Sequence, residues 1–392
     1  MRKPILSSPL RSVYVSGLLG CSFLLTACGA LRDDEGRPLT TLNPKGKQAQ
    51  RIDDLATPVF IVAAVVFVLV EGGVLYMAWR FRRRKDDVDG ELEPIQNHGN
   101  PKLEWAWTIA PAILLLGLGL MNVRTIWQLE EVPKDHMTVE VYGQQWWWEF
   151  RYDTDNDGKA DIITANQMVV PVGKHVELTI RSNDVIHSFW IPALNGKKDA
   201  VPGHSNKWSL QADEEGLFQG TCTEYCGLSH AYMRMEVKAV SPAKYEEWVD
   251  AQTTKASVPP ASDTLATQGY EEFKTNCANC HQVNGESFKF AEKTDGKPNL
   301  DYGGADHPLI SGNAPNLTHL MSRNKFAGNL FDLYTTDPNT GETVPDDSVL
   351  GSWLRDPGAM KPAAADQNRG MPNLNLSQEQ IDALVAYLHT LK

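Results

Sequence analysis

The chain has 392 residues, which is long enough for two or three domains, and 42% of them are apolar. Its formal net charge is −12. An acidic surface attracts basic partners, so we expect no nucleic acid among them. The apolar residues gather in long runs in the first third of the chain, which excludes a protein made only of soluble domains.

The N-terminus has the pattern of an export signal. Arg2 and Lys3 precede an apolar core, and small residues lead to Leu-Thr-Ala-Cys28, an order typical of a secretory signal peptide. A Cys directly after Leu-Thr-Ala resembles the lipobox of bacterial lipoproteins. We therefore predict a signal peptide over residues 1–27 and lipidation at Cys28, with an ordinary signal and an incidental Cys as the alternative. Polar residues 28–55 are predicted to form a tether.

Residues 56–130 are predicted to hold two transmembrane helices. The apolar run of 21 residues from 59 to 79 can span a bilayer. It contains Glu71, and an acid at that depth normally faces protein or water. The basic segment 80–85 follows at once and is placed in the cytoplasm by the positive-inside rule. A second apolar run, residues 105–127, returns the chain to the outer side.

Residues 135–245 change to a β pattern. Short alternating runs with turn residues between them favour a sandwich or barrel. Three consecutive Trp residues, beginning at Trp146, are an unusual cluster, for which core packing is one interpretation. The acidic stretch 153–158 has the start of a calcium loop. Its twelfth position, Thr164, is not Glu, so a polar hairpin turn is the better interpretation.

The most informative stretch is residues 222–233, which contains Cys222, Cys226, His230 and Met233. Thiolate, imidazole and a weak thioether are the ligands of an electron-transfer copper site, and a second thiolate can bridge two coppers. His187, which lies upstream on a predicted strand, supplies the second imidazole. A disulfide between the two Cys residues is the alternative in an exported protein. It would leave His230 and Met233 unexplained.

This pattern resembles the dinuclear copper (CuA) centre of cytochrome c oxidase subunit II. The resemblance implies that Cys222 and Cys226 bridge two coppers, with His187 and His230 each binding one of them. Met233 would be the weak ligand of one copper.

The same resemblance implies a cupredoxin β-barrel and roles for three further residues. The backbone carbonyl of Glu224 would bind the other copper, and its carboxylate would reach a magnesium ion shared with subunit I. Trp146 would be the surface aromatic through which electrons enter. Glu104 would form the mouth of a proton channel, although an acid at a helix N-terminus is also favoured by the helix dipole.

A second metal motif follows a linker predicted over residues 250–264. Cys277-Ala-Asn-Cys280-His281 is the attachment motif of a c-type haem, with His281 as an iron ligand. A zinc site would need another Cys or His pair, which His307 and His319 do not form. Residues 265–392 resemble a class I cytochrome c domain, which is all-α.

The second axial ligand of the haem iron is predicted to be a Met, since Met/His ligation is typical of cytochromes c. The resemblance places it in a Gly-Met-Pro loop shortly before the last helix, which favours Met371. Met360 is the alternative. Within the predicted last helix, Ile381 and Leu388 belong to a helical apolar repeat.

The sequence therefore predicts a multidomain membrane protein with a transmembrane hairpin, a cupredoxin barrel and a cytochrome c domain. The resemblance implies the electron-entry subunit of a bacterial cytochrome c oxidase in the inner membrane. Its partners would be subunits I and III, with cytochrome c or a cytochrome bc complex as donor. Dioxygen reduction and proton translocation would take place in subunit I.

Two alternatives remain from the sequence. Subunit II of a nitric oxide reductase could use the same copper centre, and Glu104 slightly favours the oxidase over it. A stand-alone membrane-tethered electron carrier would not need two spans. The intact copper ligands exclude subunit II of a quinol oxidase.

Overall fold

The computed structural model describes residues 38–83, 99–155, 157–278, 280–284, 314–364 and 369–392. The predicted signal peptide, Cys28 and the first part of the predicted tether lie outside these residues, as does His307. The chain divides into two units, of which one spans residues 50–131 and the other contains the residues on either side of it. We describe each unit by itself.

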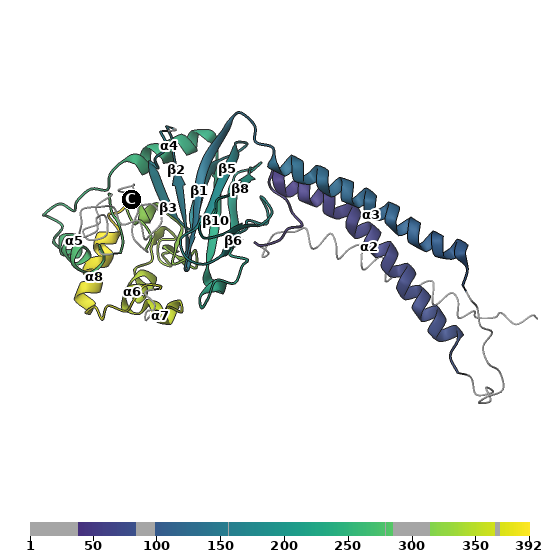
Figure 1. Ribbon diagram of the computed structural model, residues 1–392. Coiled ribbons are helices and arrows are strands. Elements are labelled where there is room, and N and C mark those ends of the chain that lie inside the picture. Colours follow the sequence, from purple (N-terminus) through teal and green to yellow (C-terminus); the bar gives the residue numbers. More distant parts are fainter. Residues whose placement is uncertain (1–37, 84–98, 156, 279, 285–313, 365–368) are drawn as a thin grey trace, which may run out of the picture. The chain divides into compact units, whose positions relative to one another are not determined.

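The first unit is a pair of long helices, α2 (Lys47–Arg80) and α3 (Pro101–Glu130). Both are long and apolar enough to cross a membrane, as predicted. Arg51 of α2 donates to the backbone carbonyl of Gln128 and forms an ion pair with Glu131 at 3.6 Å. The start of α2 therefore lies beside the end of α3 (Figure 1). Because α2 begins at Lys47, the last residues of the predicted tether are helical.

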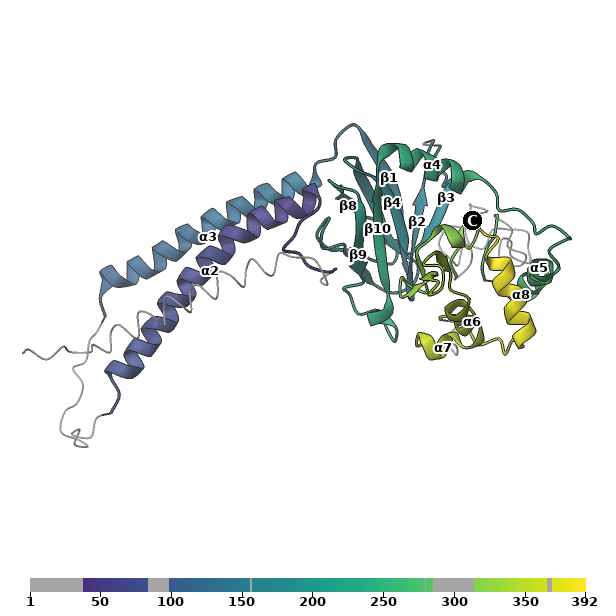
Figure 2. The same ribbon diagram turned by 180° about the vertical axis from the view of Figure 1, so that it is seen from behind.

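The other unit begins with a β domain, built from two main sheets and a small third one (Figures 1 and 2). The five-stranded sheet has the order β3-β2-β1-β5-β8, and the three-stranded sheet has the order β4-β10-β9. The strands are β1 (His136–Gln144), β2 (Trp147–Tyr152), β3 (Ile162–Ala165), β4 (Gln167–Pro171), β5 (His175–Ser182), β6 (His187–Phe189), β7 (Lys198–Ala200), β8 (Asn206–Leu210), β9 (Gly216–Thr221) and β10 (Arg234–Val240).

Apolar side chains fill the space inside this β domain, which we call the copper unit. Trp148, Phe150, Leu178 and Ile180 are all fully buried there. The predicted polar turn after β2 is found, because β2 and β3 form an antiparallel hairpin. In that turn the Asp153 carboxylate accepts the backbone N–H groups of Asp157 and Gly158. Its oxygens are therefore engaged in forming the turn.

Helix α4 (Pro242–Thr253) follows β10 and leads to the third part of the chain. Its N-terminus is capped by the Ser241 hydroxyl, as expected for a helix that begins after Ser. The helix extends into the predicted linker, so the part without regular structure starts only at Thr254. Ala256 in that part exchanges two hydrogen bonds of 2.7 Å with the side chain of Asn284.

The remaining residues, which we call the haem unit, form a small helical domain with two short hairpins. Its elements are α5 (Thr264–Asn276), β11 (Lys325–Phe326), β12 (Phe331–Asp332), β13 (Tyr334–Thr336), β14 (Thr343–Pro345), α6 (Asp347–Arg355), α7 (Pro357–Met360) and α8 (Gln378–Leu388). A capping box of Ser377 and Gln380 starts α8. Phe273 of α5 and the apolar face of α8 form the core of the unit.

Helices α5 and α8 pack closely at Gly269. A Cβ atom at this position would lie 1.9 Å from the carbonyl oxygen of Ala383 and 2.8 Å from the Cβ of Tyr387. Only glycine lets the two backbones approach to this distance, and the contact fixes the helix that carries Cys277 at its end.

We predict that Gly269→Ala lowers the free energy of unfolding of the haem unit by about 1–3 kcal/mol, because the added carbon forces the helices apart. Gly351→Ala in α6 is the matched control, since its Cβ would meet only Ile381, at 3.6 Å. Alanine is the better helix former by about 1 kcal/mol, so this control should not destabilise. Thermal unfolding of the full chain, followed by haem absorbance, measures both. Equal stability of the two variants would contradict the close packing.

Candidate metal centres

The loop between β9 and β10 presents five of the predicted copper ligands, since the Glu224 carbonyl is among them. Its ends are fixed by the antiparallel pairing of Thr221 with Arg234 and by a 2.9 Å hydrogen bond from the Cys222 N–H to the Met233 carbonyl. His187 comes from the start of β6. Cys222, Cys226, His187 and Met233 are each no more than 3% exposed. The fold therefore brings the predicted ligands together in a buried place.

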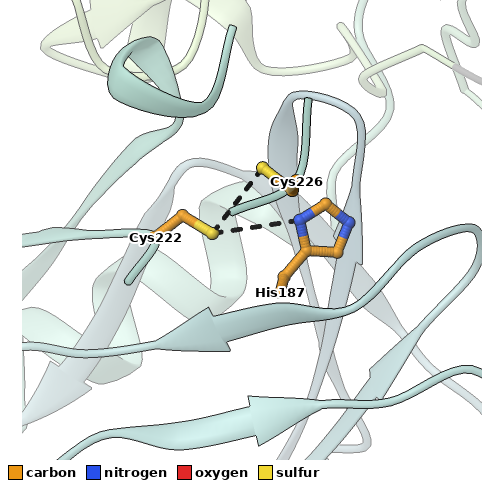
Figure 3. Close-up of side chains that lie close together, drawn as sticks. All are labelled: His187, Cys222 and Cys226. Carbon is orange, nitrogen blue, oxygen red and sulfur yellow. Dashed lines mark hydrogen bonds between the residues drawn. The ribbon is translucent and has the colours of Figure 1, made fainter. Parts of the chain in front are cut away.

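The two cysteine sulfurs lie 3.8 Å apart (Figure 3). A disulfide bond is about 2.05 Å long, so these thiols are not bonded to each other. Metal–thiolate bonds are about 2.3 Å long, so two sulfurs at this separation can share one metal ion between them. His187, Cys222 and Cys226 hold their ligand atoms within 4.8 Å of one another. The disulfide alternative is thus not found, and the donor set fits a thiolate-bridged metal centre.

The remaining ligands are divided between the two sulfurs. On one side, the His187 Nδ1 lies 3.9 Å from the Cys222 sulfur, and the Glu224 carbonyl oxygen lies 3.3 Å from it. On the other side, the His230 Nδ1 lies 3.5 Å from the Cys226 sulfur, and the Met233 sulfur lies 3.8 Å from it. Each sulfur therefore has its own imidazole, which suits two metal ions better than one.

Asp184 fixes the ring of His187, and the sequence analysis missed it. One carboxylate oxygen lies 2.8 Å from the His187 Nε2, so Nδ1 is left to face the sulfurs. Burial alone would lower the pKa of His187, but hydrogen bonds to Asp184 and Cys222 outweigh it and raise the pKa. The signal that could have identified Asp184 is its place three residues before the histidine.

The two thiols share a proton unequally. The hydrogen bond between them lowers the pKa of Cys222 to about 4, although burial opposes this shift. The same hydrogen bond raises the pKa of Cys226. A thiolate is the form that binds copper, so the hydrogen bond favours the metal-binding form of Cys222.

Trp146 lies directly beside the copper ligands. Its indole Nε1 donates to the Cys226 carbonyl at 3.0 Å, and Gln145 donates to the same oxygen at 2.7 Å. Trp146 was expected on the face of the copper unit where the haem unit docks, and with the haem unit in place it is only 4% exposed. The haem unit covers it, with Lys361 donating to the Trp146 carbonyl at 2.7 Å.

A cavity of about 390 Å³ opens within the haem unit. Its wall includes the residues of the haem attachment motif, the preferred axial methionine and four residues of the copper unit, namely Cys277, Cys280, His281, Met371, Gln145, Trp146, Trp147 and Asn166. Most of its other lining side chains are apolar, as expected for a large planar cofactor. The cavity therefore lies directly against Trp146.

His281 is oriented for a role as an iron ligand. Its Nδ1 lies 2.8 Å from the Pro315 carbonyl, so Nε2 is free for a metal. Burial lowers the pKa of His281, which favours the neutral imidazole that binds iron. The segment that contains Pro315 thus orients the ring of this histidine.

The two axial candidates lie in different places. Met371 lines the cavity, whereas Met360, at the end of α7, is not among its lining residues. Gly370 before Met371 has a φ of +82°, and a Cβ there would lie 2.6 Å from Ala363. The Gly-Met-Pro pattern thus has a structural reason, and the position favours Met371.

Arg323 is a cavity residue that the sequence analysis missed. Its guanidinium is buried, and burial lowers its pKa to about 10. It donates to the Asn316 carbonyl at 2.5 Å. A buried cation in an apolar cavity calls for an anion, and the carboxylates of a haem would provide one.

The predicted residues of the membrane helices lie apart from these centres in sequence. Glu104 is exposed in the first turn of α3, where its carboxylate accepts the N–H of the helix cap Asn100 at 3.1 Å. This capping contact agrees with the helix-terminus interpretation and leaves the channel role a prediction. Glu71 is exposed on α2, and the side chain of Glu224 is also exposed.

Comparisons with known proteins cover nearly the whole chain. Residues 137–240 match the family of the periplasmic domain of cytochrome c oxidase subunit II, and residues 44–124 match its transmembrane domain. Residues 266–392 match the cytochrome c family. These borders agree with the succession of helices, β domain and helical domain in the structure.

Some relatives match this chain over nearly the full length of both chains. Cytochrome c oxidase subunit 2 of Alkalihalophilus pseudofirmus is 34% identical over 387 residues, covering 96% of this chain and 97% of the relative. The corresponding subunit of Bacillus subtilis is 32% identical and covers 94% of each chain. A crystal structure of the periplasmic domain of subunit II of cytochrome oxidase (CoxB) of Bradyrhizobium japonicum is 33% identical, covers 31% of this chain and 96% of that chain, and has a TM-score of 0.29.

Three findings agree with one another. They are the match with relatives over nearly their whole length, the two spans, and the candidate copper and haem ligand sets. The chain belongs to the cytochrome c oxidase subunit II family and carries a cytochrome c domain at its C-terminal end.

Proposed function

We propose that this chain is the electron-entry subunit of a bacterial haem–copper cytochrome c oxidase. Electrons pass from a donor to the haem unit, from there past Trp146 to the copper centre, and on to subunit I. Subunit I reduces dioxygen and couples the reaction to proton translocation. The oxidoreductase and translocase activity therefore belongs to the complex, and this chain alone has no oxidase activity.

One observation carries the proposal. Trp146 lines the cavity of the haem unit, and its indole donates to the backbone of Cys226 at 3.0 Å. A single side chain therefore touches the candidate sites of both cofactors. Electron tunnelling falls steeply with distance, so an aromatic ring in this position favours transfer from haem to copper.

Two coppers would be held by Cys222, Cys226, His187, His230 and Met233, with the Glu224 carbonyl as a further ligand. The bound centre shares one electron between its metals, which keeps structural change small on reduction. The protein contributes a buried, preformed set of donors, in which Asp184 holds His187 at 2.8 Å. The exposed Glu224 carboxylate is available for a magnesium ion at the border with subunit I.

The haem would be attached covalently through Cys277 and Cys280, with His281 and Met371 binding the iron. Methionine ligation raises the reduction potential of a cytochrome c. The apolar cavity excludes water from the iron, and Arg323 offers its buried cation to a haem carboxylate.

The proposed place of the protein is the bacterial inner membrane, with the copper and haem units on the outer side. Residues 1–27 would be removed and Cys28 would carry a lipid. Subunits I and III are the proposed partners in the membrane, and cytochrome c or a cytochrome bc complex is the proposed donor. Glu104 would stand at the mouth of a proton channel into subunit I.

The copper centre generates a first prediction for this function. Cys222→Ser or Cys226→Ser should abolish the two-copper EPR signal, because both thiolates would be needed to hold the two metals. Met233→Leu should retain both coppers and shift the reduction potential, since the axial thioether is a weak ligand. EPR with metal analysis measures the first effect, and redox titration measures the second. A spectrum typical of a single copper in the unmodified protein would refute the dinuclear centre.

The axial ligand of the haem is tested by paired methionine variants. Met371→Ala should remove the methionine–iron charge-transfer band and allow carbon monoxide to bind, because the sixth position becomes open. Met360→Ala is the matched control and should leave the spectrum unchanged, as Met360 is not among the residues that line the cavity. The reverse result, with the band lost only in Met360→Ala, would exchange the two assignments.

Electron transfer through Trp146 is tested without emptying the site. Trp146→Leu removes both the ring and the indole donor and should slow haem-to-copper transfer strongly. Trp146→Phe retains a ring and should slow it less. Both variants should keep the copper EPR signal, because Trp146 is not a ligand. Stopped-flow reduction of the purified complex measures the rate, and equal rates in all three proteins would show that Trp146 is not on the path.

A further inference from the structure

A buried cation lies where the haem unit meets the copper unit. Lys361 directly follows α7. Its side chain donates to the Trp146 carbonyl at 2.7 Å and to the Ala327 carbonyl at 3.0 Å. The first acceptor belongs to the copper unit and the second to the haem unit. Lys361 as a whole is 9% exposed. One ammonium group therefore joins the backbones of both units.

Burying an ammonium group is unfavourable unless it is well hydrogen-bonded. Burial lowers the pKa of Lys361 to about 7. A neutral apolar side chain of similar length at this site would avoid the cost of removing a charge from water. Among the described residues, no carboxylate lies within ion-pair distance of Lys361. The stability of the haem unit alone therefore does not explain why a lysine is buried at this position.

The backbone around the ammonium is shaped to admit it. Gly328 has a φ of +85°, and a Cβ there would lie 2.5 Å from the Lys361 Nζ and 2.8 Å from the Tyr232 carbonyl. Any other residue would push against the cation and against the copper unit together. The Gly328 carbonyl also accepts the N–H of Arg234, the residue after Met233, at 3.1 Å.

Two further pairs flank this contact on the copper unit. Arg369 donates to the Gln145 side chain at 3.0 Å and lies 3.8 Å from Asp184. Asn329 donates to the buried carboxylate of Glu236 at 3.2 Å. These pairs are further contacts between the haem unit and the copper unit. Trp146, the acceptor of Lys361 in the copper unit, touches both the haem cavity and Cys226.

We propose that Lys361 is a positioning residue for electron transfer, which holds the Trp146 backbone of the copper unit against the haem cavity. The proposal rests on the transfer path through Trp146 proposed above. With the ammonium in place, the indole stays between the cavity and the Cys226 carbonyl. Without it, two buried carbonyls lose their donor, the junction loosens, and the distance that the electron must cross varies.

The test uses the purified full complex with Lys361→Met, which keeps a long apolar side chain and removes the donors. Lys274→Met is the matched control, because Lys274 pairs with Glu271 on the surface of α5 at 2.6 Å. Three quantities are measured in each protein: the copper EPR signal, the haem spectrum and the rate of haem-to-copper transfer after rapid reduction. Lys361→Arg, which keeps a cation with donors, tests for rescue.

For Lys361→Met we expect an unchanged EPR signal, an unchanged haem spectrum and a transfer rate at least about tenfold lower, equivalent to a barrier about 1.4 kcal/mol higher. The remaining transfer should become sensitive to salt, because the loosened units meet through exposed charges. Lys361→Arg should recover part of the rate, and Lys274→Met should match the unmodified complex.

Gly328→Ala is a second, independent variant that disturbs the ammonium without changing Lys361, and it should slow transfer in the same way. A rate equal to that of the unmodified complex in both Lys361→Met and Gly328→Ala would overturn the proposal. So would loss of the copper or haem signal in both, since Lys361 would then serve the folding of the units. Absence of haem-to-copper transfer in the unmodified complex would instead refute the proposed path itself, and Lys361 would have no such role.

Discussion

Two sulfur atoms held 3.8 Å apart, in a buried loop and without a bond between them, are the constraint on which the rest of the copper unit depends. An exported protein is exposed to oxidants that would join free thiols. The pairing of β9 with β10 sets the two ends of the loop, and Gln145 and Trp146 both donate to the carbonyl of Cys226. The strands thus hold the backbone of each Cys and keep the sulfurs at a distance suited to shared metal ions.

Residues that lie behind the predicted metal ligands contribute to the same arrangement. Asp184 accepts from His187 and from the N–H of Gln145, so one carboxylate orients a ligand and the loop that holds Trp146. A carboxylate in this position needs a counter-charge when it is buried. Arg369 of the haem unit lies 3.8 Å away. A charge from the haem unit therefore lies close to the carboxylate that orients His187, a predicted copper ligand.

The local motifs could be predicted from the sequence because their geometry is local. Cys222, Cys226, His230 and Met233 lie within one loop, and the haem attachment residues lie within five positions. The two spans follow from uninterrupted apolar length alone. His187 came from the resemblance together with its strand pattern, and the fold then placed it beside Cys222.

The contacts between distant segments could not be predicted. Lys361 and Trp146 are 215 positions apart, and nothing in the pattern around either residue indicates the other. Trp146 was expected on the face where the haem unit docks, but no sequence signal indicated Lys361 as the residue that contacts it there. Position in the sequence favoured Met371 over Met360. Only the cavity supplied a physical reason, and only the structure brought Arg323 into the same cavity.

The segment that joins the copper unit to the haem unit is held at several points. Helix α4 extends to Thr253, its Gln252 carbonyl lies 3.0 Å from the ring of His319, and Ala256 is hydrogen-bonded to Asn284. A pinned connection of this kind raises the effective concentration of one site at the other far above that of any freely diffusing carrier. An electron transfer across such a junction is a first-order process. Its rate does not change when the protein is diluted. Delivery of an electron to the haem unit by an external donor, in contrast, is a second-order process.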